Sequence, residues 1–224
     1  MQRKLEIACF NLESALIAEA NGAHRIELCE NYTAGGVFPS EELIKTVLEK
    51  TSIPVFVMIR PRAGNFIYTD QEIEQMKNQI QFCKQTNCDG LVFGVLTADK
   101  KINAQACTEL VKLAHPLPCT FHRAFDEVSD AEAALGQIIT SGFKRILTSG
   151  GAKTALAGKE KIKHLMDLAD DRIVLVPGGG IRSSNINALI ENTKAEEFHS
   201  AALTEESELA NAEEIQLLSK KLKA

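Results

Sequence analysis

Residues 119–151, CTFHRAFDEVSDAEAALGQIITSGFKRILTSGG, contain one complete strand–helix–strand unit. Segments typical of β-strands occupy 119–123 and 145–148, and between them 131–139 carries apolar residues at three- and four-residue spacing. Asp130 is a suitable N-cap for this helix, and Gly142 suits the strained position after its end. A helix that connects two strands in this way predicts that the strands run parallel.

The same alternation continues along the whole chain, with strand-like segments roughly 20 to 30 residues apart. Eight strands are predicted, at 5–9, 25–29, 55–60, 90–95, 119–123, 145–148, 173–176 and 197–199. Helical patterns lie between them at 12–20, 41–49, 71–84, 104–113, 131–139 and 162–168, and the last helix is expected at about 206–222. Asn11, Ser40, Asp70 and the pair Ser183 and Ser184 mark helix starts. We therefore predict the α/β class, with residues 1–224 forming a single (β/α)8 TIM barrel of parallel strands. An open doubly wound sheet is the alternative, but no Gly-x-Gly-x-x-Gly follows the first strand.

Composition narrows the classes of function. Of the 224 residues, 45% are hydrophobic and 25% charged, as in ordinary folded proteins, and the net charge of −5 argues against a nucleic-acid partner. Neither a secretory leader nor an apolar run long enough to span a bilayer is evident, so we expect a cytoplasmic protein with no membrane partner. The six cysteines form no Cys-x-x-Cys pair and are expected to be reduced thiols.

Polar residues recur at the ends of the predicted strands, where the active sites of barrel enzymes lie. Because side chains alternate along a strand, residues of one parity face the barrel axis together. The candidate catalytic residues chosen in this way, with those of the loops that follow, are Glu6, Glu27, Arg60, Arg62, His122, Arg123, Asp126 and His199. The two histidines are candidates for proton transfer. The structural alternative is that the charges form ion pairs such as Glu6 with Arg60 or Glu27 with Arg62.

Two glycine-rich turns are candidate anion sites, because backbone N–H groups at such turns bind phosphate or carboxylate. They comprise Ser149, Gly150 and Gly151 after the sixth strand, and Gly178, Gly179 and Gly180 after the seventh. Tight turning alone is the alternative explanation. Apolar positions on the last helix are compatible with a homodimer.

Several stretches of the chain together resemble the CutC family, named for copper homeostasis. The most specific are Ile59-Arg60-Pro61-Arg62 and the run Thr-Phe-His-Arg-Ala-Phe-Asp at 120–126; others lie at 13–15, 22–29, 35–36, 92–97, 146–151 and 197–200. The resemblance implies a (β/α)8 barrel, a cytosolic location and Cu(I) held by two cysteines near the first strands. One of these corresponds to Cys29, whereas the other falls on Ala8, with Cys9 one residue further. Strand alternation directs Cys9 toward the surrounding helices unless the strand end is irregular.

Two functions remain open at this stage. The first, implied by the resemblance, is a copper-homeostasis protein whose partner is a copper ion, Cu(I), bound by Cys29 with Cys9. The second is a barrel enzyme that acts by acid–base chemistry on a small anionic carboxylate or phosphate substrate. Neither a nicotinamide nor a flavin cofactor is expected, because their glycine fingerprint is missing.

Overall fold

Eight strands run parallel to one another around a common axis. In the computed structural model, which describes residues 3–204 and 209–223, they are β1 (Lys4–Cys9), β2 (Arg25–Leu28), β3 (Val55–Met58), β4 (Gly90–Phe93), β5 (Cys119–Phe121), β6 (Arg145–Thr148), β7 (Val174–Pro177) and β8 (Glu197–Ser200). Their order in the sheet is β7-β6-β5-β4-β3-β2-β1-β8, and β7 also contacts β8. The sheet therefore curves into a nearly closed barrel, and the predicted TIM-barrel fold is confirmed.

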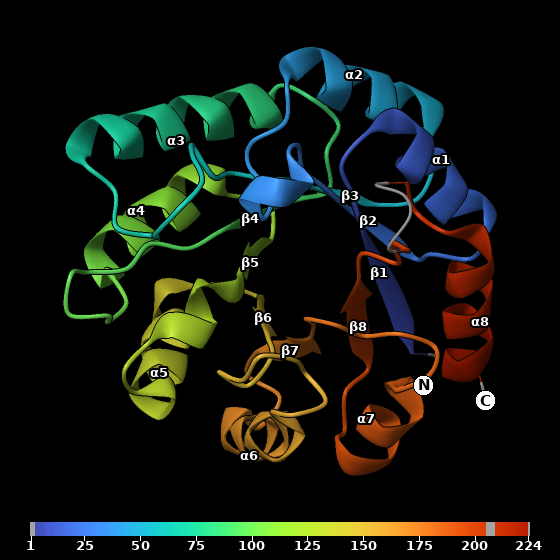
Figure 1. Cartoon of the computed structure of the whole chain (residues 1–224). Helices are drawn as coiled ribbons and strands as arrows, with labels where there is room; N and C mark the ends of the chain where they lie inside the picture. Colours follow the sequence, from blue (N-terminus) through green and yellow to red (C-terminus); the bar gives the residue numbers. More distant parts are fainter. Residues whose placement is uncertain (1–2, 205–208, 224) are drawn as a thin grey trace.

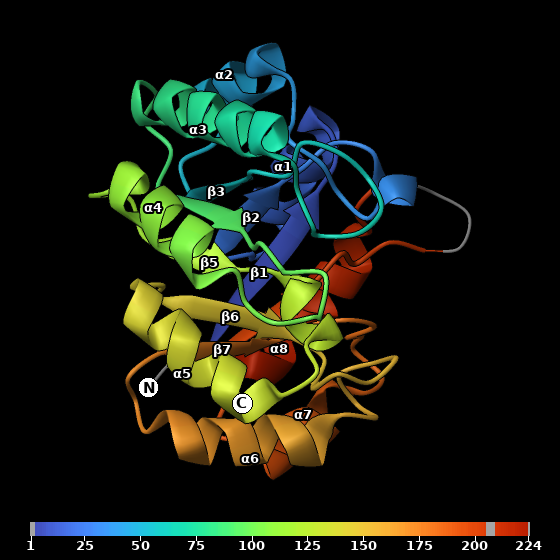
Figure 2. The ribbon, with the colours of Figure 1, turned by 90° about the vertical axis from the view of Figure 1, so that its left-hand side faces the viewer.

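A ring of helices surrounds the barrel, as Figure 1 shows in a view along its axis. The helices are α1 (Leu12–Ala20), α2 (Glu41–Lys50), α3 (Asp70–Lys84), α4 (Ala104–Ala114), α5 (Ala131–Ser141), α6 (Lys159–Ala169), α7 (Ile186–Asn192) and α8 (Ala212–Lys223). Two short 3-10 helices, η1 (Tyr32–Ala34) and η2 (Arg123–Glu127), follow β2 and β5. In the side view of Figure 2, the loops after β2 and β6 lie at the same end of the barrel. No described helix is long and apolar enough to cross a membrane.

Four local predictions need correction. The helix start predicted at Ser183 and Ser184 lies at Asn185, which is the N-cap of α7. The helix that contains Glu72 is capped by Thr69 rather than Asp70, because Thr69 and Glu72 form a reciprocal capping box. Arg123, predicted to end a strand, instead begins η2. The last helix begins at Ala212 rather than near 206; residues 205–208 lie outside the described part of the chain.

The core has an outer and an inner part, separated by the sheet. The large outer cluster fills the space between strands and helices and includes Leu5, Ile7 and Cys9 of β1. The small inner cluster consists of Cys29, Phe56, Met58 and Val92, with Phe10 packed against it. Buried charged side chains, among them Glu6, Glu27, Arg25 and His199, occupy much of the remaining interior beside apolar residues such as Ala8 and Leu147, and these charges set the chemistry of the site.

Helix α8 packs its apolar face on the barrel, where Ile215, Leu218 and Leu222 are buried. Leu217, on another side of the helix, is 41% exposed. The apolar positions that suggested a homodimer are therefore largely used within the chain, and the homodimer stays a prediction.

Candidate functional site

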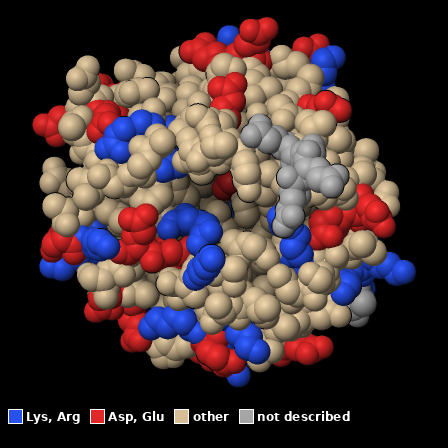
Figure 3. Space-filling view, in the orientation of Figure 1, with Lys and Arg blue, Asp and Glu red and all other residues tan. Residues whose placement is uncertain are grey.

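A cavity of about 500 Å³ opens at the carboxyl ends of the strands. Figure 3 shows it as a hollow near the centre of this face, with basic side chains beside it. The predicted residues that line it are Glu27, Cys29, Arg60, His122, Arg123, Gly179, Gly180 and His199. The remaining predicted residues do not line the cavity; they are Glu6, Cys9, Arg62, Asp126, Ser149, Gly150, Gly151 and Gly178.

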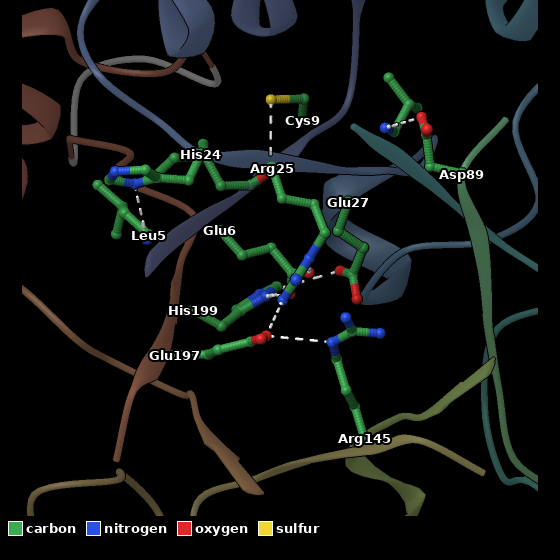
Figure 4. A network of polar contacts seen from close by, with 12 residues as sticks. Leu5, Glu6, Cys9, His24, Arg25, Glu27, Asp89, Arg145, Glu197 and His199 are labelled. Atoms are coloured by element: carbon green, nitrogen blue, oxygen red, sulfur yellow. Dashed lines mark hydrogen bonds and ion pairs between the residues drawn. The ribbon is translucent and has the colours of Figure 1, made fainter. Parts of the chain in front are cut away.

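The floor of the cavity rests on a buried network of charges, drawn in Figure 4. Arg25 of β2 donates from Nε to Glu6 Oε2 and from Nη2 to Glu197 Oε2, the latter at 2.5 Å. Glu197 also accepts a hydrogen bond of 3.1 Å from Nε of Arg145. The ring of Phe56 lies 4.9 Å from the guanidinium carbons of both arginines. Glu6 is thus paired with Arg25, not with Arg60 as the ion-pair alternative had suggested.

Glu6 also connects this network to the cavity through His199. Its Oε1 lies 2.7 Å from His199 Nδ1, and Nε2 of the same ring lies 3.9 Å from Glu27 Oε2. Burial alone would raise the pKa of Glu6, but the charge of Arg25 and the contact with His199 hold it at about 2. Glu6 is therefore ionised near neutral pH, and it orients the ring so that Nδ1 is bonded and Nε2 faces Glu27.

Glu27 and His199 are titratable groups that affect each other strongly. Burial raises the pKa of Glu27 above its ordinary value. Burial would lower the pKa of His199, yet the negative charges of Glu27 and Glu6 raise it overall. The network contains the carboxyl groups of Glu6, Glu27 and Glu197 and the guanidinium groups of Arg25 and Arg145, so neutrality requires one further proton. Because the pKa values of Glu27 and His199 are both raised, this couple is the part of the network that takes up a proton most readily.

The other predicted histidine has a different character. His122 directly follows β5 as the N-cap of η2, and its Nδ1 accepts a hydrogen bond of 3.3 Å from the amide of Ala124. Burial and the nearby positive charge of Arg60 lower the pKa of His122 to about 3. The ring is therefore neutral at physiological pH, and it does not take up a proton as His199 can.

The two arginines of the Arg-Pro-Arg run separate. Arg60 donates from Nη1 to the carbonyls of Ala34 and Gly36, at 2.8 and 2.9 Å, and from Nη2 to that of Gly64 at 2.8 Å. Arg62 turns away from the cavity and forms an ion pair with Glu72 of α3. Arg60 therefore belongs to the site, while Arg62 joins neither the site nor Glu27.

The turn after β6 has its donors already engaged. Asp126 accepts hydrogen bonds from the amides of Ser149 and Gly151, at 2.9 and 3.0 Å, and the Gly150 amide donates to Thr148 Oγ1 at 2.9 Å. The carboxylate of Asp126 thus occupies the position that the sequence suggested for a bound anion. It also pairs with Arg123 at 2.7 Å and so fixes that side chain at the cavity wall.

The turn after β7, by contrast, has backbone N–H groups that meet no acceptor among the described residues. The Gly178 amide is bonded to the carbonyl of Thr148 at 2.9 Å, but within residues 3–204 and 209–223 no acceptor meets the amides of Gly179 and Gly180. Gly179 has φ +101°, and a Cβ there would lie 2.8 Å from Arg123 Nη1, so glycine allows the guanidinium to approach the backbone. These amides and Arg123 are suitable donors for an anion.

The thiols of Cys9 and Cys29 lie on opposite sides of the sheet. Ala8 and Cys29 line the cavity, whereas Cys9 is buried in the outer core, and its thiol donates to the carbonyl of Ile7 at 3.6 Å. Cys29 donates to Glu27 Oε2 at 3.6 Å. Burial and the charge of Glu27 raise the pKa of both thiols. The cavity therefore offers one thiol, that of Cys29, together with the thioether of Met58, and the two-thiolate site implied by the resemblance is not formed.

One group in the described residues has donor atoms placed for a metal ion. Ligand atoms of Glu6, Glu27 and His199 lie within 4.8 Å of one another. Such a set of two carboxylates and an imidazole can hold a metal, although it favours harder ions than Cu(I), which prefers sulfur. Glu6 is in addition bonded to Arg25, whose positive charge opposes a nearby cation.

Sequence reasoning missed three arginines. Arg25 shares its strand face with Glu27, Arg145 begins β6, and Arg182 follows the glycine turn and lines the cavity. Two-residue alternation from Glu27 was a sufficient signal for Arg25. No comparable signal existed for Arg182, which lies in a loop.

Comparison with known proteins identifies the family of this chain. A model of the CutC family matches residues 3–204. A copper homeostasis protein cutC homolog from Mus musculus is 50% identical over 198 residues, which are 88% of this chain and 73% of the relative. The crystal structure of CutC from Streptococcus agalactiae, 33% identical, has a TM-score of 0.85 and covers 90% of this chain and 100% of its own. Phosphoribosylanthranilate isomerase from Thermotoga maritima, 15% identical with a TM-score of 0.66 and covering 99% and 98% of the two chains, is alike in fold alone. Since the model spans most of its length and relatives reach this identity, the chain belongs to the CutC family.

Proposed function

We propose that this protein is an enzyme that moves a proton on a small anionic substrate bound at the barrel mouth. The observation that carries the proposal is the contact series Glu6–His199–Glu27, with 2.7 Å between Glu6 Oε1 and His199 Nδ1 and 3.9 Å between His199 Nε2 and Glu27 Oε2. A carboxylate that orients an imidazole beside a second carboxyl group is suited to general acid–base catalysis. Glu6 acts as the positioning residue, and the Glu27–His199 couple holds the exchangeable proton.

The charge of the cavity wall favours an anion. Arg60 and Arg182 donate to backbone carbonyls or a hydroxyl group, and among the described residues neither forms an ion pair. Arg123 shares its charge with Asp126, and Glu127 adds one negative charge to the lining. The amides of Gly179 and Gly180 have no acceptor within residues 3–204 and 209–223, and Gly179 lies against Arg123. A phosphate or carboxylate would therefore find both charge and directed N–H donors there.

Binding of the anion is tested by calorimetry with inorganic phosphate and with acetate. Arg182→Met should weaken the preferred anion by roughly tenfold or more, because it removes a charged donor. Arg172→Met is the matched control: among the described residues Arg172, like Arg182, forms no ion pair, and it donates to the backbone carbonyls of Leu168 and Ala169, but it lies outside the cavity. Equal affinities in the two variants would reject the cavity as the anion site.

Proton transfer is tested by hydrogen–deuterium exchange into small phosphorylated and carboxylated compounds in D₂O, followed by NMR. Glu27→Gln and His199→Gln should abolish exchange into a compound that the native protein labels, while anion affinity is retained. Native rates in both variants would reject the proposed couple.

Copper binding is a second candidate, favoured by the family's name and by one observation: Cys29 lies in the same cavity, beside Glu27. An anaerobic Cu(I) titration against a competing chelator tests it, with Cys29→Ser as the variant and Cys9→Ser as the control on the other side of the sheet. Stoichiometric binding lost in Cys29→Ser alone would support a copper role. Either function suits a cytoplasmic protein, where six unpaired thiols would remain reduced.

A further inference from the structure

Three residues of the cavity wall carry buried polar atoms that have no hydrogen-bond partner among the described residues. They are Glu27 Oε1, Arg60 Nε and His122 Nε2. Buried polar groups are nearly always bonded, so several orphans around one cavity indicate that a ligand supplies the missing partners. Glu27 already has a place in the proposed proton transfer. The other two atoms lack a role.

His122 Nε2 is a hydrogen-bond donor. Because the Ala124 amide donates to Nδ1, that nitrogen carries no hydrogen, and the single N–H of the neutral ring is at Nε2. The pKa of about 3 keeps the ring neutral over the whole physiological range. His122 lines the cavity, and its uncharged Nε2–H is buried there in a fixed orientation.

Arg60 is held with similar precision. Three backbone carbonyls accept from three of its five N–H groups, and of the two that remain, one on Nη2 and one on Nε, the Nε atom is buried without any partner among the described residues. The ring of Phe66 packs on both groups, 4.8 Å from the Arg60 guanidinium carbon and 4.7 Å from the His122 ring centre. The two N–H donors thus share one rigid neighbour, on residues that follow β3 and β5. The Glu27–His199 couple comes from β2, the neighbour of β3, and from β8, which lies on the far side of β1.

We propose that the substrate is a small carbonyl compound bearing an anionic group, and that His122 Nε2–H and Arg60 Nε–H bind its carbonyl oxygen. This inference rests on the proposed function and names its substrate class. Fixed N–H donors in a water-poor site stabilise negative charge that develops on an oxygen, and a neutral imidazole is an effective donor for this purpose.

The reaction that follows is an enolisation. The Glu27–His199 couple removes a proton from the carbon next to the carbonyl group. The C–H electron pair forms the new C=C bond, and the carbonyl π pair moves to the oxygen, where the two N–H groups stabilise the enolate. Return of the proton to the same carbon gives exchange or epimerisation. In a hydroxycarbonyl compound, its return to the former carbonyl carbon gives isomerisation, provided that the proton of the neighbouring hydroxyl group passes to the enolate oxygen and that hydroxyl carbon becomes the new carbonyl. Electrons and protons balance within the substrate and the couple.

Calorimetry with phosphoglycolohydroxamate, a planar mimic of an enediolate, tests the inference. Ethyl phosphate is the matched probe that carries the anion without the oxygen pair. A second arm of the experiment compares N-hydroxyoxamate, the corresponding carboxylate mimic, with acetate as its matched anion. The two arms together distinguish a phosphate from a carboxylate substrate. In one arm, the native protein should bind the hydroxamate at least about 100-fold more tightly than its match.

His122→Phe should reduce the affinity for the hydroxamate on the order of 100-fold and leave the matched anion unchanged, which also shows that the variant is folded. His122→Gln, whose amide retains an N–H near the Nε2 position, should restore part of the loss. The carbonyl inference alone would be overturned by either of two results. One is that each hydroxamate binds no more tightly than its matched anion, and the other is that tight binding of the hydroxamate is retained in His122→Phe. If none of the four probes binds, the anion site of the proposed function is also rejected.

Discussion

Replacement of Arg25 by methionine removes the charge at the centre of the buried network while it keeps a long apolar side chain. Arg25 is 5% exposed and lies between the carboxylates of Glu6 and Glu197, which are 3% and 8% exposed. Loss of one partner from a buried ion pair costs about 3–5 kcal/mol, because the other charge remains buried without compensation. We expect Arg25→Met to lower the free energy of unfolding by this amount at neutral pH.

The pKa of Glu6 gives a second route to the magnitude. Its decrease from 4.5 to about 2 on folding corresponds to about 3 kcal/mol of stabilisation. Because the folded-state pKa is lowered, this stabilisation is complete above the ordinary value of 4.5 and is lost as the pH falls from there to about 2. Without Arg25 the pKa of Glu6 rises, so the difference between native protein and variant should shrink in acid.

Urea unfolding followed by far-ultraviolet circular dichroism measures the effect, since the chain has no tryptophan. Lys194→Met is the control: its ion pair with Asp167 is 83% and 51% exposed, and its loss should change stability by less than about 0.5 kcal/mol. The reasoning is refuted if Arg25→Met costs less than about 1 kcal/mol, or if its cost does not depend on pH.

Three further outcomes are expected. Gly94→Ala places a Cβ 2.9 Å from His122 Nδ1, so it should lower stability by about 1–3 kcal/mol in urea and weaken the hydroxamate probe; an unchanged affinity would count against the fixed ring. Arg62→Ala removes only the contact with Glu72 and its neighbouring loop, so calorimetry should find native phosphate affinity, and a large loss would return Arg62 to the site. All six buried thiols should react with Ellman's reagent far faster in urea than in the native protein, and fewer than six in urea would indicate a disulfide.

The fold was predictable because local signals and topology agree. Alternating strand and helix patterns place all eight strands, and Asn11, Ser40 and Asp130 are observed as helix caps. The cap at Thr69 was missed because Thr69 and Asp70 are both good N-caps, and the reciprocal bond to Glu72 decides between them only in three dimensions.

Sequence reasoning predicted which side chains of the site face the barrel interior, but not which of them form ion pairs with one another. Alternation directed Glu27 and His199 inward correctly. The partner of Glu6 depends on register, however, because β1 pairs Glu6 directly with Arg25 of β2. Sequence does not specify which residues of neighbouring strands lie side by side, and it does not show that the loop after β3 turns Arg62 toward α3.

The buried charges themselves argue for a chemical role. A set of apolar side chains of similar volume would stabilise a barrel core equally well or better, since burial of ion pairs costs as much as it returns. Here two arginines neutralise two of the three carboxylates, and the third, Glu27, shares a proton with His199 at the cavity wall. A purely structural network would be expected to close on itself with every group paired. Among the described residues this one leaves Glu27 Oε1 and Arg145 Nη1 without partners, and it ends in the titratable Glu27–His199 couple, which lines the cavity, as a proton-transferring enzyme requires.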